Sequence, residues 1–179
     1  MMWFLFIIDI IFVFVLISVA VQFFNILFRG HAPFLSTNKR VVRQIVKEIK
    51  LKPGEIFYEL GAGRAGLLKV LSQQEPKAKF IALEYAFLPY FLARLQHAFS
   101  KAQIKIKRRN MFRVGLHEAD YIYCYLNPHM MQKLEKKFTR ECKAGTIIIS
   151  YQFKLPHLRP YRMITVGHHE RIYFYRLGR

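Results

Sequence analysis

Apolar and polar positions follow two contrasting patterns along the chain, and the first is a long apolar run. From Trp3 to Phe28 nearly every residue is apolar, and Asp9 is the one charged side chain. A helix rises about 1.5 Å per residue, so this segment is long enough to cross the roughly 30 Å apolar core of a bilayer. We therefore expect residues 1–28 to form a transmembrane anchor.

The rest of the chain alternates short apolar runs with amphipathic segments. Short β-prone runs predict strands, and apolar positions three and four residues apart predict helices between them. The expected strands span residues 55–59, 79–84, 104–109, 120–126, 146–151, 162–166 and 171–176. The expected helices span residues 38–50, 67–74, 90–101 (beginning near Pro89) and 130–141. Ser36, Thr37 or Asn38 can cap the first of these helices.

Regular alternation of strand and helix predicts the fold class. It implies an α/β domain with a mostly parallel sheet and right-handed crossovers, and the last two strands add an antiparallel hairpin. We divide the chain into the anchor (1–28), a linker with an amphipathic helix (29–50) and the α/β domain (51–179).

Charge is distributed unevenly between these parts. The net charge is +18, and every Lys and Arg lies at or after Arg29. The positive-inside tendency places this basic flank in the cytoplasm and the short N-terminus outside. A cleaved signal peptide is the alternative, but it has a basic n-region and an apolar segment of only about 7–15 residues.

Strong basicity has two usual partners, anionic lipid and nucleic acid. Because the expected anchor holds the domain at a membrane, we interpret the basic clusters as lipid-facing or solvated. These clusters are Lys101, Lys105, Lys107, Arg108 and Arg109, and Lys133, Lys136, Lys137 and Arg140. No zinc-finger, RNP or basic-zipper pattern supports nucleic-acid binding. Cys124 and Cys142 form no ligand-like spacing, so the sequence predicts no metal site and fits a reducing compartment.

A Gly-rich turn follows the first expected strand of the domain. It reads Glu59-Leu60-Gly61-Ala62-Gly63-Arg64-Ala65-Gly66. Glycines let the backbone approach a ligand closely, and an acid at a strand end can accept hydrogen bonds from it. Glu84 ends the next strand 25 residues after Glu59, a position that faces ribose hydroxyls in such units. An ordinary tight turn is the alternative.

The spacing Glu59-x-Gly61-x-Gly63-x-Ala65 resembles the first motif of S-adenosylmethionine-dependent methyltransferases of the Rossmann-like class. That motif is acid-x-Gly-x-Gly-x-Gly, so alanine replaces its third glycine here. The pattern G-x-G-x-x-G also fits Gly61, Gly63 and Gly66, which leaves a NAD-type oxidoreductase open. Such an enzyme needs an acid–base residue at its hydride site, and the sequence offers no persuasive one.

Further segments occur in a specific order along nearly the whole chain. They are Pro33–Thr37, Glu59–Gly63, Glu84, Asn110–Phe112, Tyr125–Pro128, Met130–Lys137 and Ser150–Pro156. This order resembles the small, membrane-anchored lysine methyltransferase family of bacteria, archaea and mitochondria. Its mitochondrial members modify the ATP synthase c-subunit and the adenine nucleotide translocator. The resemblance implies a class I, seven-stranded methyltransferase fold that uses S-adenosyl-L-methionine and releases S-adenosyl-L-homocysteine.

The same resemblance implies cofactor-binding roles at matching positions. A loop around Thr37 covers the cofactor, and Glu59, Gly61 and Gly63 hold its methionine part. Glu84 binds the ribose hydroxyls. Asn110, followed by Met111, stands where the family usually has Asp and contacts the adenine. The family also usually has an acid where this chain has Arg64.

The motif Tyr125-Leu126-Asn127-Pro128 ends the fourth strand, where ligands bind in open α/β sheets. Methyl transfer from a sulfonium is an in-line displacement, so the enzyme must hold a neutral amine beside the methyl carbon. The amide oxygen of Asn127 and a backbone carbonyl can accept hydrogen bonds from that amine, and the phenol of Tyr125 can act similarly. Desolvation lowers the pKa of a lysine substrate. A plain Asn-Pro turn is the alternative.

These patterns together predict a methyltransferase at the cytoplasmic membrane surface that modifies a lysine of a membrane protein. A phospholipid amine methyltransferase fits the same anchor and basic surface. The replaced third glycine, Arg64 and Asn110 also leave a non-catalytic membrane scaffold open. A mitochondrial precursor usually carries an Arg-rich presequence, so we favour a prokaryotic plasma membrane over the mitochondrial inner membrane.

Overall fold

The computed structural model describes residues 2–29, 37–98, 104–167 and 169–178, and it divides the chain into two compact units. The first unit, Met1–Pro33, holds helix α1 (Met2–Arg29). Within it, Trp3–Val21 is long and apolar enough to cross a membrane, judged by length and composition. Ser36, the segment 33–36 and Lys101, all named above, lie outside the described residues.

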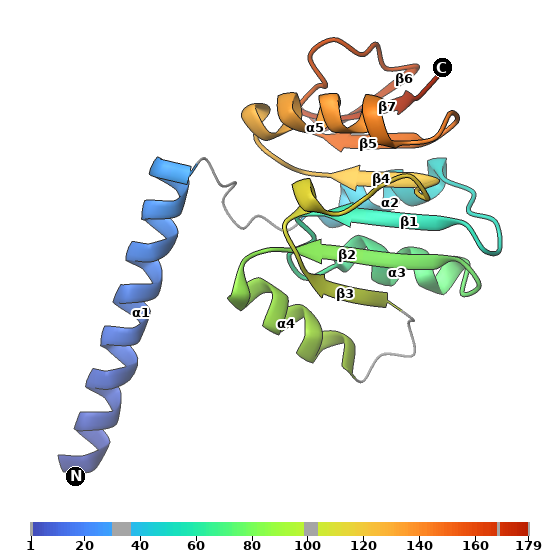
Figure 1. The fold of residues 1–179 in the computed structure, drawn as a ribbon. Coiled ribbons are helices and arrows are strands. Elements are labelled where there is room, and N and C mark those ends of the chain that lie inside the picture. Colours follow the sequence, from blue (N-terminus) through green and yellow to red (C-terminus); the bar gives the residue numbers. More distant parts are fainter. Residues whose placement is uncertain (1, 30–36, 99–103, 168, 179) are drawn as a thin grey trace. The chain divides into compact units, whose positions relative to one another are not determined.

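The second unit, Phe34–Arg179, is built on one seven-stranded sheet with the order β3-β2-β1-β4-β5-β7-β6 (Figure 1). The strands are β1 (Ile56–Leu60), β2 (Lys79–Glu84), β3 (Ile104–Arg108), β4 (Tyr121–Cys124), β5 (Ile147–Tyr151), β6 (Arg162–Val166) and β7 (Glu170–Arg176). Strands β1 to β5 pair in parallel, whereas β7 pairs antiparallel with both β5 and β6. The predicted parallel sheet with a closing antiparallel hairpin is therefore confirmed.

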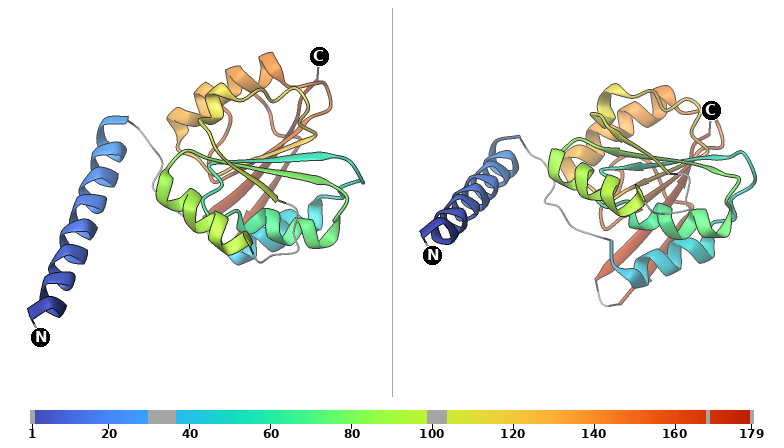
Figure 2. Two further views of the ribbon diagram at one scale, coloured as in Figure 1. Left: turned by 60° about the horizontal axis from the view of Figure 1, so that its bottom comes forward. Right: turned by 90° about the horizontal axis from the view of Figure 1, so that it is seen from below.

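Helices cover both faces of this sheet (Figure 2). They are α2 (Lys39–Glu48), α3 (Gly66–Gln74), α4 (Phe87–Ala98) and α5 (Pro128–Glu141), with a short 3-10 helix η1 (Met111–Arg113). Helices α2, α3 and α4 lie on one face, and α5 lies on the other. Asn38 is the residue that caps α2, because its side chain accepts a hydrogen bond from the backbone N–H of Arg40.

Two helices begin earlier than the pattern predicts, and proline explains both differences. α4 begins at Phe87, so Pro89 lies inside its first turn. A proline is tolerated there because first-turn N–H groups need no partner within the helix. α5 begins with Pro128 directly after its N-cap Asn127, a position that proline favours.

The hydrophobic core of the second unit lies between the sheet and α2 and α3. Its large, fully buried side chains include Phe57, Phe80, Leu67, Leu68 and Leu71. Every residue of this core cluster lies between Val41 and Phe174. Because all the described residues of this cluster belong to the second unit, we expect that unit to fold without α1.

The environment of one basic residue, Lys137, differs from the prediction. Lys137 is buried, and its ammonium group pairs with Glu141 one turn further along α5. It therefore belongs to the packing of α5 and not to a solvated or lipid-facing cluster. The exposed Lys133, Lys136 and Arg140 lie on the other side of the helix.

Candidate active site

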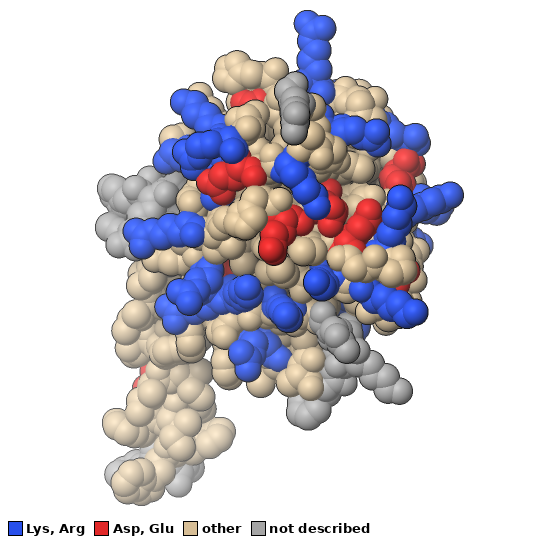
Figure 3. Space-filling model, turned by 45° about the vertical axis from the view of Figure 1, so that its right-hand side comes forward, with Lys and Arg blue, Asp and Glu red and all other residues tan. Residues whose placement is uncertain are grey.

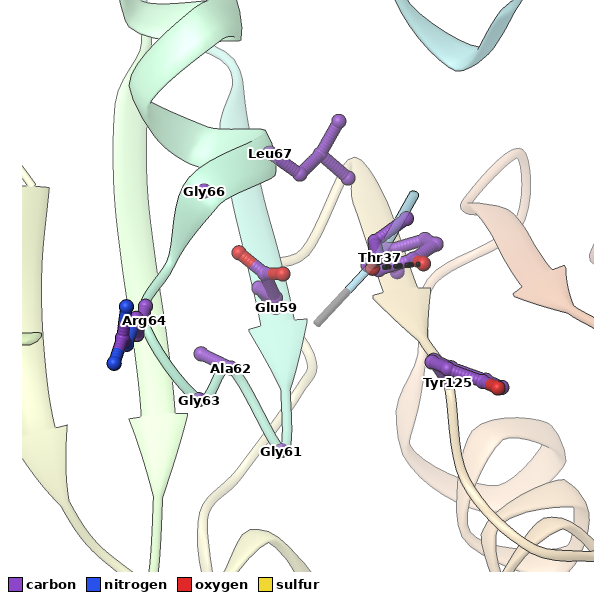
Figure 4. Close-up of a pocket in the computed structure, with 10 residues that line it drawn as sticks. Thr37, Glu59, Gly61, Ala62, Gly63, Arg64, Gly66, Leu67 and Tyr125 are labelled. Carbon is purple, nitrogen blue, oxygen red and sulfur yellow. Dashed lines mark hydrogen bonds between the residues drawn. The ribbon is translucent and has the colours of Figure 1, made fainter. Parts of the chain in front are cut away.

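A pocket opens beside the Gly-rich turn, where β1 and β4 end (Figure 4). The turn, the ends of these strands, the start of α3 and the residue before α2 all contribute to it. Its lining residues are Thr37, Glu59, Gly61, Ala62, Gly63, Arg64, Gly66, Leu67, Tyr123 and Tyr125. Five of the residues proposed from the sequence line this pocket, although they are spread over nearly half of the chain. They are Thr37, Glu59, Gly61, Gly63 and Tyr125.

Glu59 is the acidic group of this pocket, and it is almost fully buried. Burial raises the pKa of Glu59 to about 8; a hydrogen bond from the Leu68 backbone opposes this shift, and nearby Glu84 adds to it. One carboxyl oxygen, Oε2, is buried and has no hydrogen-bond partner among the described residues. A buried, unpartnered acceptor is costly, so this oxygen fits a ligand that brings a hydrogen-bond donor or a positive charge. The amino group of S-adenosylmethionine has both properties.

The backbone of the Gly-rich turn enters the left-handed region three times. Gly61, Gly63 and Ala65 have φ values of 69°, 53° and 52°. A Cβ built at Gly61 would lie 2.9 Å from Cδ2 of Leu126, so that side chain would have to shift, and the φ of 69° independently favours glycine. Ala65 stands where the motif has its third glycine, and it adopts the conformation that glycine favours.

Glu84 holds the turn to the end of β2. Its Oε2 accepts a hydrogen bond from the Gly63 backbone (3.0 Å), and its Oε1 accepts one from the Ala86 backbone (2.8 Å). Each carboxylate oxygen can accept more than one hydrogen bond, so these contacts are compatible with a further bond to a ligand hydroxyl. Glu84 therefore links the Gly-rich turn to the segment that follows β2.

Asn110 and Met111 follow β3 at the same edge of the sheet. The side-chain oxygen of Asn110 accepts a hydrogen bond from the Phe112 backbone (2.9 Å) and caps η1. Met111 is buried, and its Cε would lie 3.9 Å from a Cβ at Gly61. Neither residue is among those that line the pocket, although Met111 packs beside the Gly-rich turn.

The segment after β4 carries the residues proposed for catalysis. Strand β4 ends at Cys124, so Tyr125 has already left the hydrogen-bond ladder and lines the pocket. The side-chain oxygen of Asn127 accepts a hydrogen bond from the Met130 backbone (2.9 Å), which makes Asn127 the N-cap of α5. Pro128 is the first residue of that helix. The Asn-Pro pair thus has a structural role, whatever it also does in catalysis.

Sequence reasoning missed two groups of residues around the pocket. Tyr123 lines it, and its hydroxyl lies 2.8 Å from Oγ1 of Thr37. Alternate residues of a strand share a face, so the predicted strand 120–126, which included Tyr125, could also have indicated Tyr123. The second group comprises Tyr151, whose ring lies 4.4 Å from that of Tyr125, and Glu170, which accepts a 2.6 Å hydrogen bond from the Tyr151 hydroxyl. The pairing of β5 with β7 creates this contact, and no local pattern signals it.

The structure also bears on metal binding. Among the residues that it describes, no group of three His, Cys, Asp or Glu side chains could hold a metal ion. The polar side chains that line the pocket are the Glu59 carboxyl, the Arg64 guanidinium and the hydroxyls of Thr37, Tyr123 and Tyr125.

Several known proteins are similar to this chain. A protein-lysine N-methyltransferase of Saccharolobus islandicus (strain REY15A) is 24% identical over 153 residues, which cover 83% of this chain and 95% of that protein. The adenine nucleotide translocase lysine N-methyltransferase of Mus musculus is 25% identical over 143 residues, covering 78% of this chain and 61% of the mouse protein.

Solved structures show the same fold. An RNA methyltransferase from Salinibacter ruber in complex with S-adenosyl-L-homocysteine superposes with a TM-score of 0.74 at 20% identity, covering 80% of this chain and 94% of that one. The B. subtilis tRNA methyltransferase TrmK superposes with a TM-score of 0.63 at 15% identity, covering 80% of this chain and 68% of that one. Identities this low establish the architecture and not the substrate.

A family model described as the ANTKMT methyltransferase domain matches residues 59–162, more than half of the chain. The match begins at the buried acid of the pocket, includes the Gly-rich turn and the Tyr125–Pro128 segment, and ends in β6. The chain therefore belongs to the ANTKMT methyltransferase domain family and is an S-adenosylmethionine-dependent methyltransferase.

Proposed function

We propose that this methyltransferase transfers methyl groups to a lysine side chain of a membrane protein. The observation that carries the proposal is one continuous pocket between the buried Glu59 carboxyl and the Tyr125 edge of the sheet. A cofactor and an amine can meet there. Both relatives described above are named as lysine methyltransferases, and the mouse enzyme is named for a translocase.

The pocket residues suggest how this chain holds the cofactor. Glu59 accepts the hydrogen bonds of its amino group, and Gly61 and Gly63 let the backbone approach the methionine part. Glu84, fixed by the turn, faces the ribose hydroxyls. Asn110 and Met111 lie outside the pocket lining, and we assign them to contact with the adenine; Thr37 with its Tyr123 contact covers the opposite side. The bound cofactor supplies an electrophilic methyl group on a sulfonium.

The chain's own contribution to transfer is to orient the amine and to exclude water. Tyr125 lies at the pocket edge, and burial and nearby Glu170 raise the pKa of its phenol. The phenol therefore stays neutral near pH 7 and can accept a hydrogen bond from an amine. The amide of Asn127 adds a second polar group, and Pro128 fixes the backbone that carries it.

The membrane location rests on the first unit and the charge of the second. α1 has the length and composition of a spanning helix, and the basic residues follow it. With the short N-terminus outside and the methyltransferase domain (51–179) in the cytoplasm, the positive-inside tendency is satisfied. The positively charged domain then faces the anionic lipids of the membrane.

Labelling with radioactive S-adenosylmethionine tests this function. Membranes that contain the protein are incubated with the cofactor, and label is measured in protein bands and in the chloroform-soluble fraction. We expect label in a protein band, on a lysine when that band is digested and analysed by mass. Label in the lipid fraction would instead identify a phospholipid amine methyltransferase.

A matched pair of variants keeps the test specific to the pocket. Glu59→Gln should abolish labelling because the amide cannot carry the negative charge that a cationic amino group requires. Glu118→Gln removes an exposed acid outside the pocket and should label like the unaltered protein. Calorimetry with S-adenosylhomocysteine and NAD provides the last control, since a scaffold would bind neither and an oxidoreductase would bind NAD.

A further inference from the structure

Helix α4 carries an apolar face whose side chains are about half exposed. Phe87, Leu88, Phe91 and Leu95 are 61%, 46%, 45% and 50% exposed, and we call these four residues the α4 face. They share one side of the helix, because residues three and four apart are neighbours on a helix surface. The opposite side of α4 is buried toward the sheet through Pro89, Ala93 and His97. A cluster of exposed apolar side chains of this kind marks an interaction site.

Basic side chains lie on α4 and on the neighbouring edge strand β3, and the segments that carry them contain no acidic residue. The exposed cations of α4, β3 and the residue that follows β3 are Arg94, Lys105, Lys107, Arg108 and Arg109. The guanidinium of Arg108 lies 5.4 Å from the centroid of the Phe87 ring, so charge and apolar surface are in direct contact. The described segments 85–98 and 104–109 contain no Asp or Glu.

Charge alone would not single out this region. Figure 3 shows Lys and Arg side chains spread widely over one face of the molecule, around a smaller group of acidic residues. What distinguishes α4 is the combination of exposed aromatic and aliphatic side chains with cations and no acids. Exposed aromatic and aliphatic side chains beside cations suit a membrane interface, where the apolar groups enter among the acyl chains and the cations meet anionic headgroups.

The α4 face is also connected to the cofactor pocket at both ends of the helix. Glu84, at the end of β2 and three residues before the first residue of α4, accepts a hydrogen bond from Gly63 of the Gly-rich turn. In the last turn of α4, Nε2 of His97 lies 3.1 Å from the carbonyl oxygen of Arg64 in the same turn. A surface that holds α4 therefore also fixes where the pocket sits relative to that surface.

We propose that the α4 face and its neighbouring cations dock on an anionic lipid bilayer, as a second membrane contact besides α1. This inference rests on the proposed membrane location. Its consequence is orientation: a tether alone leaves the domain free to turn, whereas a docked α4 presents the pocket at a fixed height above the lipid. Lysines of membrane proteins at that height are then the accessible substrates.

Fluorescence depth measurements on the full chain test this contact directly. An environment-sensitive probe is attached at Phe91→Cys in a Cys142→Ser background, where Cys124 stays buried and unlabelled. The protein is reconstituted in phosphatidylcholine vesicles with roughly one-third phosphatidylglycerol, the anionic lipid that the cations require. We expect brominated acyl chains to quench this probe and to leave a probe at Lys136→Cys, on α5 across the sheet, unquenched.

Each other outcome overturns the proposal in a defined way. Equal quenching at both positions would mean that no particular face docks. A probe at position 91 that is shielded from water but unaffected by brominated lipid would mean that a second copy or another protein covers α4. Because quenching needs no methyl transfer, failure of the lysine assignment would not change this result.

A second set of variants removes the contribution of α1. The unit Phe34–Arg179 has its own core, so it can be studied without the helix. Its flotation with anionic vesicles should fall roughly tenfold or more when Phe87, Phe91 and Leu95 are all replaced by Gln. Met163→Gln removes a similarly exposed apolar side chain (51%) from the hairpin and should float normally. Equal flotation of the two variants would overturn the proposal, and unchanged S-adenosylhomocysteine affinity shows that each is folded.

Discussion

We expect Glu59 to couple cofactor binding to proton release. Burial holds the pKa of its carboxyl at about 8 in the ligand-free protein, so most of these groups carry a proton at pH 7. A bound cation lowers the pKa of a neighbouring acid, and the proton then leaves. Calorimetry at pH 7 in two buffers of different ionisation enthalpy should detect release of roughly one proton per S-adenosylmethionine bound. Glu59→Gln should show no such release, and release from that variant would contradict the assignment.

The same shift makes ligand-free stability depend on pH. The folded pKa of Glu59 lies above its unfolded value of about 4.3, so the native state binds the proton more tightly. Its contribution to stability is complete below about pH 4 and is lost as the pH rises toward 8. The free energy of unfolding by urea should therefore decrease between pH 5 and pH 8 in the unaltered protein. In Glu59→Gln the free energy of unfolding should decrease less over the same pH range. The difference from the unaltered protein should be a few kcal/mol at most, on the order of 1 kcal/mol for each unit by which the pKa is raised.

Ala65 explains how the altered glycine motif can still form the turn, and at what cost. Its φ of 52° is a left-handed conformation that disfavours a side chain by roughly 1–2 kcal/mol. Ala62 lies in the same turn, is also buried, and is absent from the residues with positive φ. Both alanines lose a buried methyl group on mutation to glycine, but only Ala65→Gly relieves strain. Chemical denaturation should show Ala65→Gly to be about 1 kcal/mol more stable than Ala62→Gly; equal stabilities would argue against strain at position 65.

Asn127 combines a helix cap with a proposed catalytic amide, and substitutions can separate the two. Asp and Ser are also good N-caps, so Asn127→Asp and Asn127→Ser should keep the hydrogen bond to Met130 and the stability of α5. Asn127→Ala should cost about 1 kcal/mol in unfolding free energy. If the amide oxygen orients the amine, Asn127→Ala and Asn127→Ser lose methyl transfer while retaining cofactor affinity, whereas Asn127→Asp keeps an acceptor oxygen at that position. Full activity of Asn127→Ser would limit this residue to its capping role.

At the scale of elements, α5 organises the loop that follows β5. Buried Glu135 accepts hydrogen bonds from the backbones of His157 (2.8 Å) and Leu158 (2.7 Å), and from Nδ1 of His157 (2.9 Å). Removing it leaves two backbone donors without their charged acceptor, at about 1.5–3 kcal/mol per bond to a charged group. Glu135→Ala should therefore destabilise the domain by a few kcal/mol and increase hydrogen exchange at these two amides. Gln132→Ala, an exposed change on the same helix, is the control and should alter neither.

Sequence periodicity predicted elements well because most of them bury one face. Strand β2 has the expected bounds, residues 79–84, since its apolar run ends in Glu84. Prediction was poorer at the starts of α4 and α5, where a proline inside the first turn resembles a helix boundary. The pattern also extended the fourth strand to residue 126, although β4 ends at Cys124. The residues beyond it turn away from the sheet and supply the pocket edge and the α5 cap.

The candidate site was predictable where it is continuous along the chain and not where strand pairing assembles it. The spacing of Glu59, Gly61 and Gly63 is local, so it indicated the turn without a structure. The contact of Tyr151 with Glu170 depends on the antiparallel return of β7 along β5. The clash between a Cβ at Gly61 and Leu126 depends likewise on two neighbouring parallel strands. Such constraints appear only when the strand order is known.

At the scale of the whole molecule, the two units carry different parts of the activity. The described residues that line the pocket begin at Thr37, and the core begins at Val41, so both belong to Phe34–Arg179. Binding of the cofactor therefore needs only the second unit. We expect the first unit, as the proposed membrane tether, to raise the concentration of the domain around membrane-bound substrates, a gain that commonly reaches about 10²–10⁴-fold.

Deleting residues 1–33 separates these contributions. The affinity of the truncated protein for S-adenosylhomocysteine, measured by calorimetry, should match that of the full chain, because no described pocket or core residue is lost. Methylation of a membrane substrate should fall strongly. The remaining activity should decrease further as salt rises, since only screened contacts between cations and lipid then hold the domain at the bilayer. A truncated protein with weakened cofactor affinity would show that the pocket needs the first unit, whereas salt-independent residual activity would show that substrate recognition alone brings the domain to its lysine.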